Sequence, residues 1–266
     1  MFAVLAAKDS YELRRYWRIM QSMKRGSWRG NLSALVEEQA GLVTRQQALD
    51  AGVPRRTLDR LTAGEGSFEK VDHGVYRLRG ASPPDHLELR AAWLQLAPAE
   101  PIWLRSAVEG VVSHRSAADM YGVGHLPEER HDFTVGARHQ SRRADVRIHR
   151  RKLTEKEWLI LRGLPVTRPA RIASDLLYDH EDPTGVAHVI SDSLRSVYDY
   201  PSTVAEALAR HAARFGLRRG DGVGLLRTLL ELTGDPQTEL WLSEARAGGT
   251  AGMERAPATV GGYPLR

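Results

Sequence analysis

Apolar residues recur along residues 31–61 with the periodicity of α-helices, and the pattern divides into three short helices. Asn31 can cap a helix over Leu32–Gln39 that places its apolar side chains on one face. Gly52 can adopt the left-handed conformation that a tight turn between two helices requires. Pro54 suits the first turn of the next helix, where its missing N–H costs nothing. This pattern predicts a helix-turn-helix.

A short hairpin is predicted directly after these helices. Phe68–Leu78 carries β-branched and aromatic residues on both sides of Asp72, His73 and Gly74, and Gly74 can take a positive φ in the turn. A hairpin after the second helix of a helix-turn-helix is the wing of a winged helix. An ordinary helical hairpin with a solvated arginine face is the alternative that the helices alone leave open.

Several basic and hydroxyl-bearing side chains fall on the outward positions of this unit. In helix-turn-helix proteins the start of the second helix contacts base edges and phosphates. Basic residues on the wing are expected to contact phosphates. The expected DNA-contacting residues are Thr44, Arg45, Arg55, Arg56, Thr57, Arg60, Lys70, His73 and Arg77.

The remainder of the chain predicts a second, mixed domain. Residues 80–84 form a linker, helices are expected at 86–96 and 113–121, and strands at 131–135, 145–149, 158–161 and 164–167. Helical stripes follow from 169 onward. The fold class is therefore α+β: an N-terminal winged helix-turn-helix followed by a mixed α/β domain that ends in a helical bundle.

This pattern divides the chain into four parts, which are listed at the end of this paragraph. Because the winged helix is compact, we expect it to fold without the rest of the chain, so that a fragment of residues 28–82 still binds DNA. The expected parts are a basic N-terminal arm (1–30), the winged helix-turn-helix (31–80), a mixed α/β regulatory domain (83–246) and a disordered tail (247–266).

Composition and charge narrow the class of protein. The 266 residues include no cysteine, and no apolar run is long enough for a membrane span, so we expect a soluble cytoplasmic protein. Residues 1–80 carry 14 Lys and Arg against 9 Asp and Glu, whereas residues 153–266 carry 13 against 15. The positive excess is expected on the winged helix, and the acidic C-terminal third favours a protein partner.

A second basic cluster lies between the expected strands of the mixed domain. It is either a solvated hairpin edge kept from aggregating by its charge or a second surface for phosphates or for an acidic partner. Its residues are Arg138, Arg142, Arg143, Arg147, Arg150 and Arg151.

No catalytic constellation is expected. Ser113, His114 and Asp119 are adjacent in sequence, and such neighbours rarely point to one place; no glycine-flanked nucleophile turn surrounds the serine. The glycine-rich loops 64–66 and 220–224 lack a following Lys-Ser/Thr pair, so they are poor phosphate-binding loops. We expect no catalytic residues, no metal site and no cofactor.

Ordered short motifs point to a known family. They include Gly41–Ala48, Val71–Leu78, Val112–Ala118, Gly163–Arg171 and Arg218–Gly222. Together these pieces resemble the AbiEi family, the antitoxin half of bacterial type IV toxin–antitoxin pairs. The resemblance implies a winged-helix domain that represses its own operon and a C-terminal domain needed to neutralise a nucleotidyltransferase toxin. Some relatives continue into a restriction-like nuclease, for which too few residues remain here.

These observations lead to three functional hypotheses. The first is a DNA-binding antitoxin and autorepressor, with operator DNA of inverted repeats and a nucleotidyltransferase toxin as partners. The second is a stand-alone winged-helix regulator whose C-terminal domain senses a ligand or forms a dimer. The third is an enzyme acting on nucleic acid or on a partner protein, for which the sequence offers no nucleophile, metal set or phosphate loop.

Overall fold

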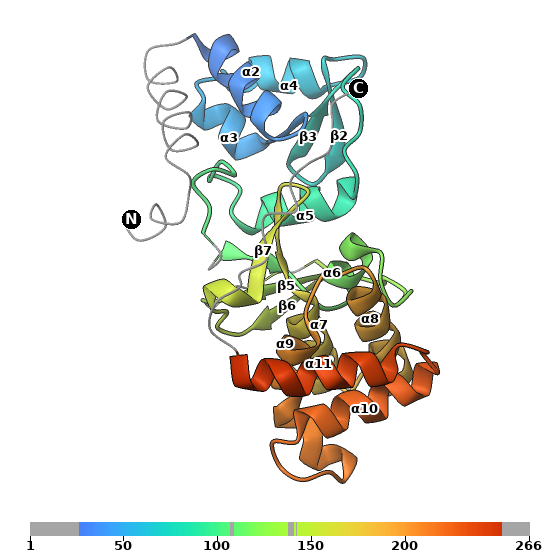
Figure 1. Cartoon of the computed structure of the whole chain (residues 1–266). Coiled ribbons are helices and arrows are strands. Elements are labelled where there is room, and N and C mark those ends of the chain that lie inside the picture. The colour runs from blue at the N-terminus through green and yellow to red at the C-terminus, as the bar shows by residue number, and fades with distance from the viewer. Residues whose placement is uncertain (1–26, 107–108, 138–140, 142, 252–266) are drawn as a thin grey trace. The chain divides into compact units, whose positions relative to one another are not determined.

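The computed structural model describes residues 27–251, with the exception of 107–108, 138–140 and 142 (Figure 1). The chain forms two compact units. The first contains the residues up to 120 together with 127–167, and the second contains 121–126 together with the chain from 168 onward. Strands and helices build the first unit and helices build the second, which confirms the α+β class. Most of the expected arm and tail lies outside the described residues.

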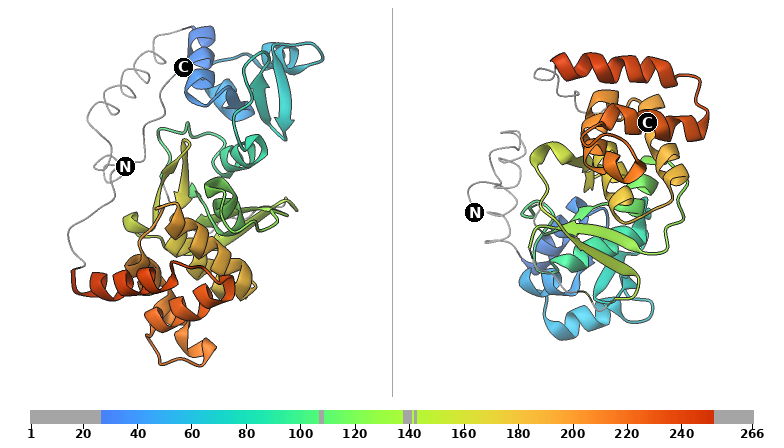
Figure 2. Two further views of the ribbon diagram at one scale, coloured as in Figure 1. Left: turned by 45° about the vertical axis from the view of Figure 1, so that its right-hand side comes forward. Right: turned by 90° about the horizontal axis from the view of Figure 1, so that it is seen from below.

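The first unit begins with a winged helix-turn-helix. Its three helices lie beside a three-stranded antiparallel sheet of order β1-β3-β2, as two views show (Figures 1 and 2). The elements are α2 (Trp28–Glu38), β1 (Leu42–Thr44), α3 (Arg45–Asp50), α4 (Arg55–Thr62), β2 (Phe68–Asp72) and β3 (Val75–Leu78).

Helix α2 starts earlier than the sequence indicates. Its N-cap is Ser27, whose hydroxyl accepts a hydrogen bond from the backbone N–H of Gly30, so the expected cap at Asn31 is wrong. Asn31 is instead buried inside the helix, where its Nδ2 donates to the carbonyl of Ala51 at 3.1 Å. The first turn has no apolar periodicity, and for this reason the pattern missed it.

Small and apolar residues bring the two helices of the helix-turn-helix together. Ala48 is fully buried, and Gly52 has a φ of +91° in the turn, as its position predicts. Leu58 anchors α4 from its inner side, in a cluster with Val53 and Phe68.

A segment after the wing completes this domain. Helix α5 (Leu87–Leu96) is followed by a strap, defined here as residues 97–106. Trp103 of the strap is 5% exposed and packs against Leu35 of α2 and Ala51. The strap therefore supplies part of the core of the helix-turn-helix, and the expected boundary at residues 80–83 falls inside the first unit.

Polar side chains tie the strap to the helix-turn-helix as well. Gln47 donates to the carbonyl of Glu100 at 3.0 Å, and Gln39 accepts from the N–H of Ile102. The two glutamines also hydrogen-bond to each other. Because all of these groups are buried or half-buried, removing the strap would leave polar atoms without partners, which is costly.

Arg105 fixes the strap to the end of α5. Its guanidinium donates to the carbonyls of Trp93, Leu94 and Ala97, which are acceptors left over where that helix ends, and to the carbonyl of Glu100 in the strap. The guanidinium also stacks over the Trp93 ring at 4.3 Å. Burial lowers the pKa of Arg105 to about 10.

A mixed five-stranded sheet makes up the rest of the first unit. Its strand order is β6-β5-β4-β8-β7, with β5–β6 and β4–β8 parallel and the other two pairs antiparallel. Four of its strands were expected within about one residue, whereas β4 was not, and neither was β1 of the three-stranded sheet. The elements are β4 (Val111–Val112), α6 (His114–Tyr121), β5 (His131–Val135), β6 (Val146–Arg150), the 3₁₀ turn η3 (Glu155–Glu157), β7 (Trp158–Leu161) and β8 (Leu164–Thr167).

The second unit is the expected helical bundle. Helix α10 packs against α8 and α9, and α9 also contacts α7 and α11. Each of α7, α8 and α9 begins with a proline in its first turn, as the sequence predicts. The elements are α7 (Pro169–Tyr178), α8 (Pro183–Arg195), α9 (Pro201–Leu208), the 3₁₀ helix η4 (Ala209–Phe215), α10 (Gly222–Thr233) and α11 (Thr238–Ala251).

The glycine-rich segment 220–224 has a structural role in this bundle. Asp221 caps α10, because its carboxylate accepts from the N–H of Gly224 at 2.7 Å. Gly222 lies where α10 meets α9, and a Cβ added there would be 1.8 Å from the carbonyl oxygen of Ala205. The glycine therefore permits a close approach of two helices.

Candidate nucleic-acid interface

The outer face of α4 is basic. Arg55, Arg56 and Arg60 are exposed, and Thr57 is half-buried. Leu58 lies on the opposite face of the helix and is buried in the core. Because the leucine faces the core, the three arginines face solvent. Its N-terminal turn, where Arg55 and Arg56 lie, is the part of a recognition helix that contacts base edges.

Thr44 is placed differently from the other expected contacts. It is 0% exposed and caps α3 in a capping box with Gln47. Its hydroxyl also donates to the carbonyl of Pro98 in the strap. A side chain with no exposed surface cannot reach DNA, so we remove Thr44 from the interface.

Arg45 links the two helices of the motif. Its guanidinium contacts the carboxylate of Asp59 on α4 at 2.9 Å. The hydrogen bond to Asp59, with a smaller contribution from Tyr76, raises the pKa of Arg45 above its usual value. Arg45 is about two-fifths exposed, and it already has an acidic partner, so we regard it as a weaker DNA contact than the arginines of α4.

Two wing arginines are held by the wing itself. Arg77 forms an ion pair with Glu69 on the neighbouring strand, donates to the carbonyl of Ala81 and keeps only 15% of its side chain exposed. Arg79 donates to the carbonyls of Gly64 and Gly66, and so fixes the loop between α4 and β2. Lys70 and His73, in contrast, are exposed.

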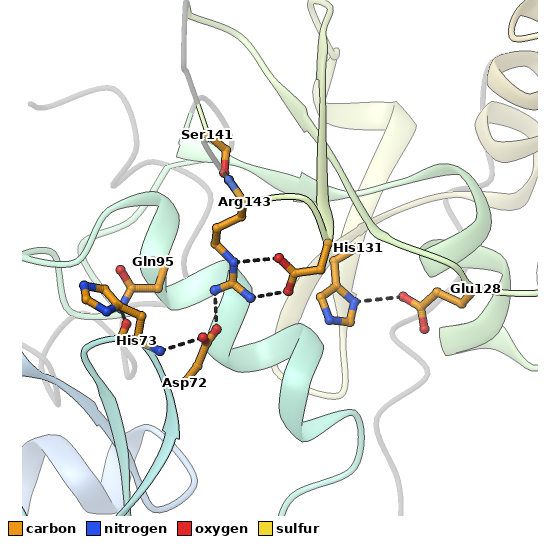
Figure 3. Close-up of polar contacts among 8 residues, drawn as sticks. Asp72, His73, Gln95, Glu128, His131, Ser141 and Arg143 are labelled. Atoms are coloured by element: carbon orange, nitrogen blue, oxygen red, sulfur yellow. Dashed lines mark hydrogen bonds and ion pairs between the residues drawn. The ribbon is translucent and has the colours of Figure 1, made fainter.

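The tip of the wing contacts the rest of the first unit. A β-bulge interrupts the pairing of β2 and β3 between Lys70 and Asp72. The Asp72 carboxylate then forms an ion pair with Arg143, which lies between β5 and β6 (Figure 3). At the next residue of the tip, Gln95 of α5 donates to the carbonyl of His73.

The second basic cluster is divided by the structure. Arg138 and Arg142 lie outside the described residues. Arg143 is paired with Asp72 and Asp145, whereas Arg147 and Arg150 are exposed on β6, and Arg151 is half-buried after it. β6 is an edge strand, so its charges also suit the protective role considered above.

The cations of the winged helix thus fall into two groups. Arg45, Arg77 and Arg79 neutralise acidic groups of the protein, as does Arg143, which lies outside the winged helix between β5 and β6. In the part of the chain that is described, the exposed Arg55, Arg56, Arg60 and Lys70 form no ion pair.

This arrangement corrects the expected location of the charge. Residues 27–80 carry 8 Lys and Arg against 7 Asp and Glu, so most of the excess in the first 80 residues belongs to residues 1–26. The winged helix presents positive charge on α4 and β2 because Asp59, Glu69 and Asp72 are paired with other cations, and its net charge contributes little.

The serine and histidine at the start of α6 form a buried network. Ser113 is 0% exposed, its hydroxyl contacts Nδ1 of His114 at 2.9 Å, and Asp119 pairs with His86. His114 stacks on His149 at 3.5 Å, and His149 contacts Asp132. A serine with no exposed surface is not available to a substrate.

These features define the class of the N-terminal part: a winged helix-turn-helix with an exposed basic recognition helix. Residues 32–79 match the family described as "Transcriptional regulator, AbiEi antitoxin". The resemblance to this family is therefore confirmed for this segment of the chain. The match covers the winged helix, and the likeness of the later motifs stays a prediction.

Other comparisons are more distant. The crystal structure of the RV2827C protein from Mycobacterium tuberculosis is similar to this chain at 17% sequence identity and a TM-score of 0.43, covering 82% of each chain. No curated protein matches the chain. Among the described residues, no helix combines the length and apolarity that crossing a membrane requires.

Proposed function

We propose that the chain binds operator DNA through α4 and the wing, and so regulates transcription of its own operon. The observation that carries this proposal is a group of exposed cations on one winged helix that form no ion pair with any residue the structure describes: Arg55, Arg56, Arg60 and Lys70. Unpaired cations can replace the counterions around phosphates, and α4 has the size that a major groove accepts.

The N-terminal arginines of α4 are expected to read bases. Changing Arg55 or Arg56 to Ala should weaken binding to the operator by about 1–3 kcal/mol if the contact is bidentate to a base. Gel-shift titrations with the DNA upstream of the gene measure the effect, and a scrambled duplex shows whether the loss is specific. Operator affinity unchanged in both variants would contradict the assignment of α4.

The wing provides a test of phosphate contacts with a matched control. Lys70→Ala should weaken binding to all sequences alike and reduce the salt dependence of log K by about one unit of slope. Arg77→Ala removes the same charge one strand position from Tyr76, the partner of Lys70 in the ladder, but Arg77 is held by Glu69. Its salt slope should therefore stay that of the wild type. Equal slopes for all three proteins would exclude a phosphate contact by Lys70.

The antitoxin role is proposed from the family description of residues 32–79. In this proposal the chain counteracts a partner nucleotidyltransferase toxin, in addition to repressing transcription. The alternative is a stand-alone regulator whose C-terminal part senses a ligand or forms a dimer. A neighbouring reading frame that encodes a nucleotidyltransferase, and whose toxicity this chain relieves on co-expression, would favour the antitoxin.

A further inference from the structure

The tip of the wing is acidic, which is unfavourable on a surface that is to approach DNA. Asp72 ends β2, and its carboxylate accepts a hydrogen bond from the N–H of His73 at 2.6 Å. An uncompensated carboxylate here would repel phosphates. The only cation that contacts it among the described residues is Arg143, from a segment 71 residues later in the chain.

Arg143 is held firmly on its own side of this contact. Its Nε donates to Asp145 at 3.0 Å, and a second hydrogen bond from the same guanidinium reaches the other oxygen of that carboxylate. The hydrogen bonds to Asp145, and then to Asp72, raise the pKa of Arg143 above its usual value. The guanidinium is thus oriented by a bidentate pair before it meets the wing.

Two side chains from outside the wing contact its tip. Arg143 contacts Asp72, and Gln95 of α5 contacts the carbonyl of the next residue, His73 (Figure 3). Gly74, which completes the turn, has the amide of Gln95 next to it. Strand β1 supports the β3 side of this hairpin, because it pairs with β3 as far as Val75 and the N–H of Arg45 donates to the carbonyl of Gly74 at 2.7 Å. Arg143 and Gln95 add restraints at Asp72 and His73, on the β2 side of the turn.

We propose that Arg143 is a positioning residue for DNA binding, which acts through Asp72 without touching DNA. This inference rests on the proposed function. Arg143 offsets part of the negative charge of the wing tip, since it is shared with Asp145, and it fixes the hairpin so that Lys70 and His73 are held in one orientation. The Arg143–Asp72 pair thereby makes the five-stranded sheet part of the DNA-binding apparatus.

The decisive variant is Asp72→Ala, because a positioning role and a purely repulsive role of this carboxylate predict opposite changes in operator affinity. Removing an acidic group from a DNA-binding surface ordinarily strengthens binding, and it would also release Arg143 for phosphates. If Arg143 positions the wing, Asp72→Ala should instead weaken operator binding by about 5-fold, the size expected when a half-exposed ion pair and the order it maintains are lost. Arg143→Ala should weaken it similarly, and the double variant should be no weaker than either single one.

Glu65→Ala is the matched control. Glu65 is an exposed acidic residue in the loop between α4 and β2, and it forms no ion pair in the described part of the chain. Its removal should leave operator affinity unchanged or raise it slightly. Affinity that rises in Asp72→Ala as it does in Glu65→Ala would overturn the proposal. The proposal would also be overturned if the losses of affinity added up in the double variant and if Arg143→Ala, but not Asp72→Ala, reduced the salt slope. A direct phosphate contact by Arg143 would behave in this way.

Hydrogen exchange of the wing amides in the full-length protein separates this inference from the proposed function. Exchange across residues 68–78 should become faster in Arg143→Ala and Asp72→Ala and stay unchanged in Glu65→Ala. If the wild-type protein does not bind operator DNA and these exchange rates still rise, the proposed function fails and the restraint on the wing stands. If exchange is unaffected in both variants, the restraint itself is excluded, whatever the DNA affinities are.

Discussion

A fragment of residues 27–82 is expected to unfold without cooperativity, whereas a fragment of residues 27–106 is expected to fold. The shorter fragment ends before the strap, so Leu35 and Ala51 lose their contact with Trp103. Replacing a buried tryptophan by Ala typically costs about 3–5 kcal/mol, and a core of this size rarely supplies more than that. The expectation that residues 28–82 fold alone is therefore revised.

Circular dichroism during urea titration of both fragments measures the difference. In the full-length chain, Trp103→Ala should lower the free energy of unfolding by about 3–5 kcal/mol. Leu104→Ala is the matched control, because Leu104 belongs to the same strap and is exposed; its effect should stay within about 0.5 kcal/mol. A shorter fragment that unfolds as cooperatively as the longer one would show that the strap adds nothing to the domain.

Local sequence signals account for much of the fold. Helix α4 and the wing were predictable because Gly52, Pro54 and Gly74 each fix one turn, and periodic apolar residues fill the segments between them. Strand β1 was missed because three residues are too few to show a period. It exists because β3, more than thirty residues later, pairs with it.

The candidate site was predictable only as a set of residue types. Arg55 and Arg77 are equally basic in the sequence, and nothing local distinguishes them. The difference is made by Glu69, which lies across the ladder from Arg77 and neutralises it, while no acidic group of the described segments pairs with Arg55. Thr44 likewise suits a DNA contact until Pro98, 54 residues later, covers its hydroxyl. Contacts between distant segments decide which charges remain available.

Gly222→Ala is expected to destabilise the helical unit by about 3 kcal/mol or more, at the upper end of the cost of overpacking. A Cβ at Gly222 would lie 1.8 Å from the carbonyl oxygen of Ala205 and 2.8 Å from its carbonyl carbon. These are backbone atoms of α9, so a side-chain rotation cannot relieve the clash, and α10 must move away from α9. That movement separates Leu225 and Leu226, both fully buried, from their neighbours.

Gly30→Ala makes the same chemical change where space is available. The nearest atom to a Cβ at Gly30 is the hydroxyl oxygen of Ser27, at 3.9 Å. Since alanine is the better helix former, this variant should be more stable than the wild type by about 0.5–1 kcal/mol. Urea unfolding followed by circular dichroism compares the two. Both variants add the same methyl group. If Gly222→Ala lowers the free energy of unfolding and Gly30→Ala raises it, the loss of stability in Gly222→Ala comes from the contact between α10 and α9. A Gly222→Ala protein as stable as the wild type would mean that the two helices are not in contact at this glycine.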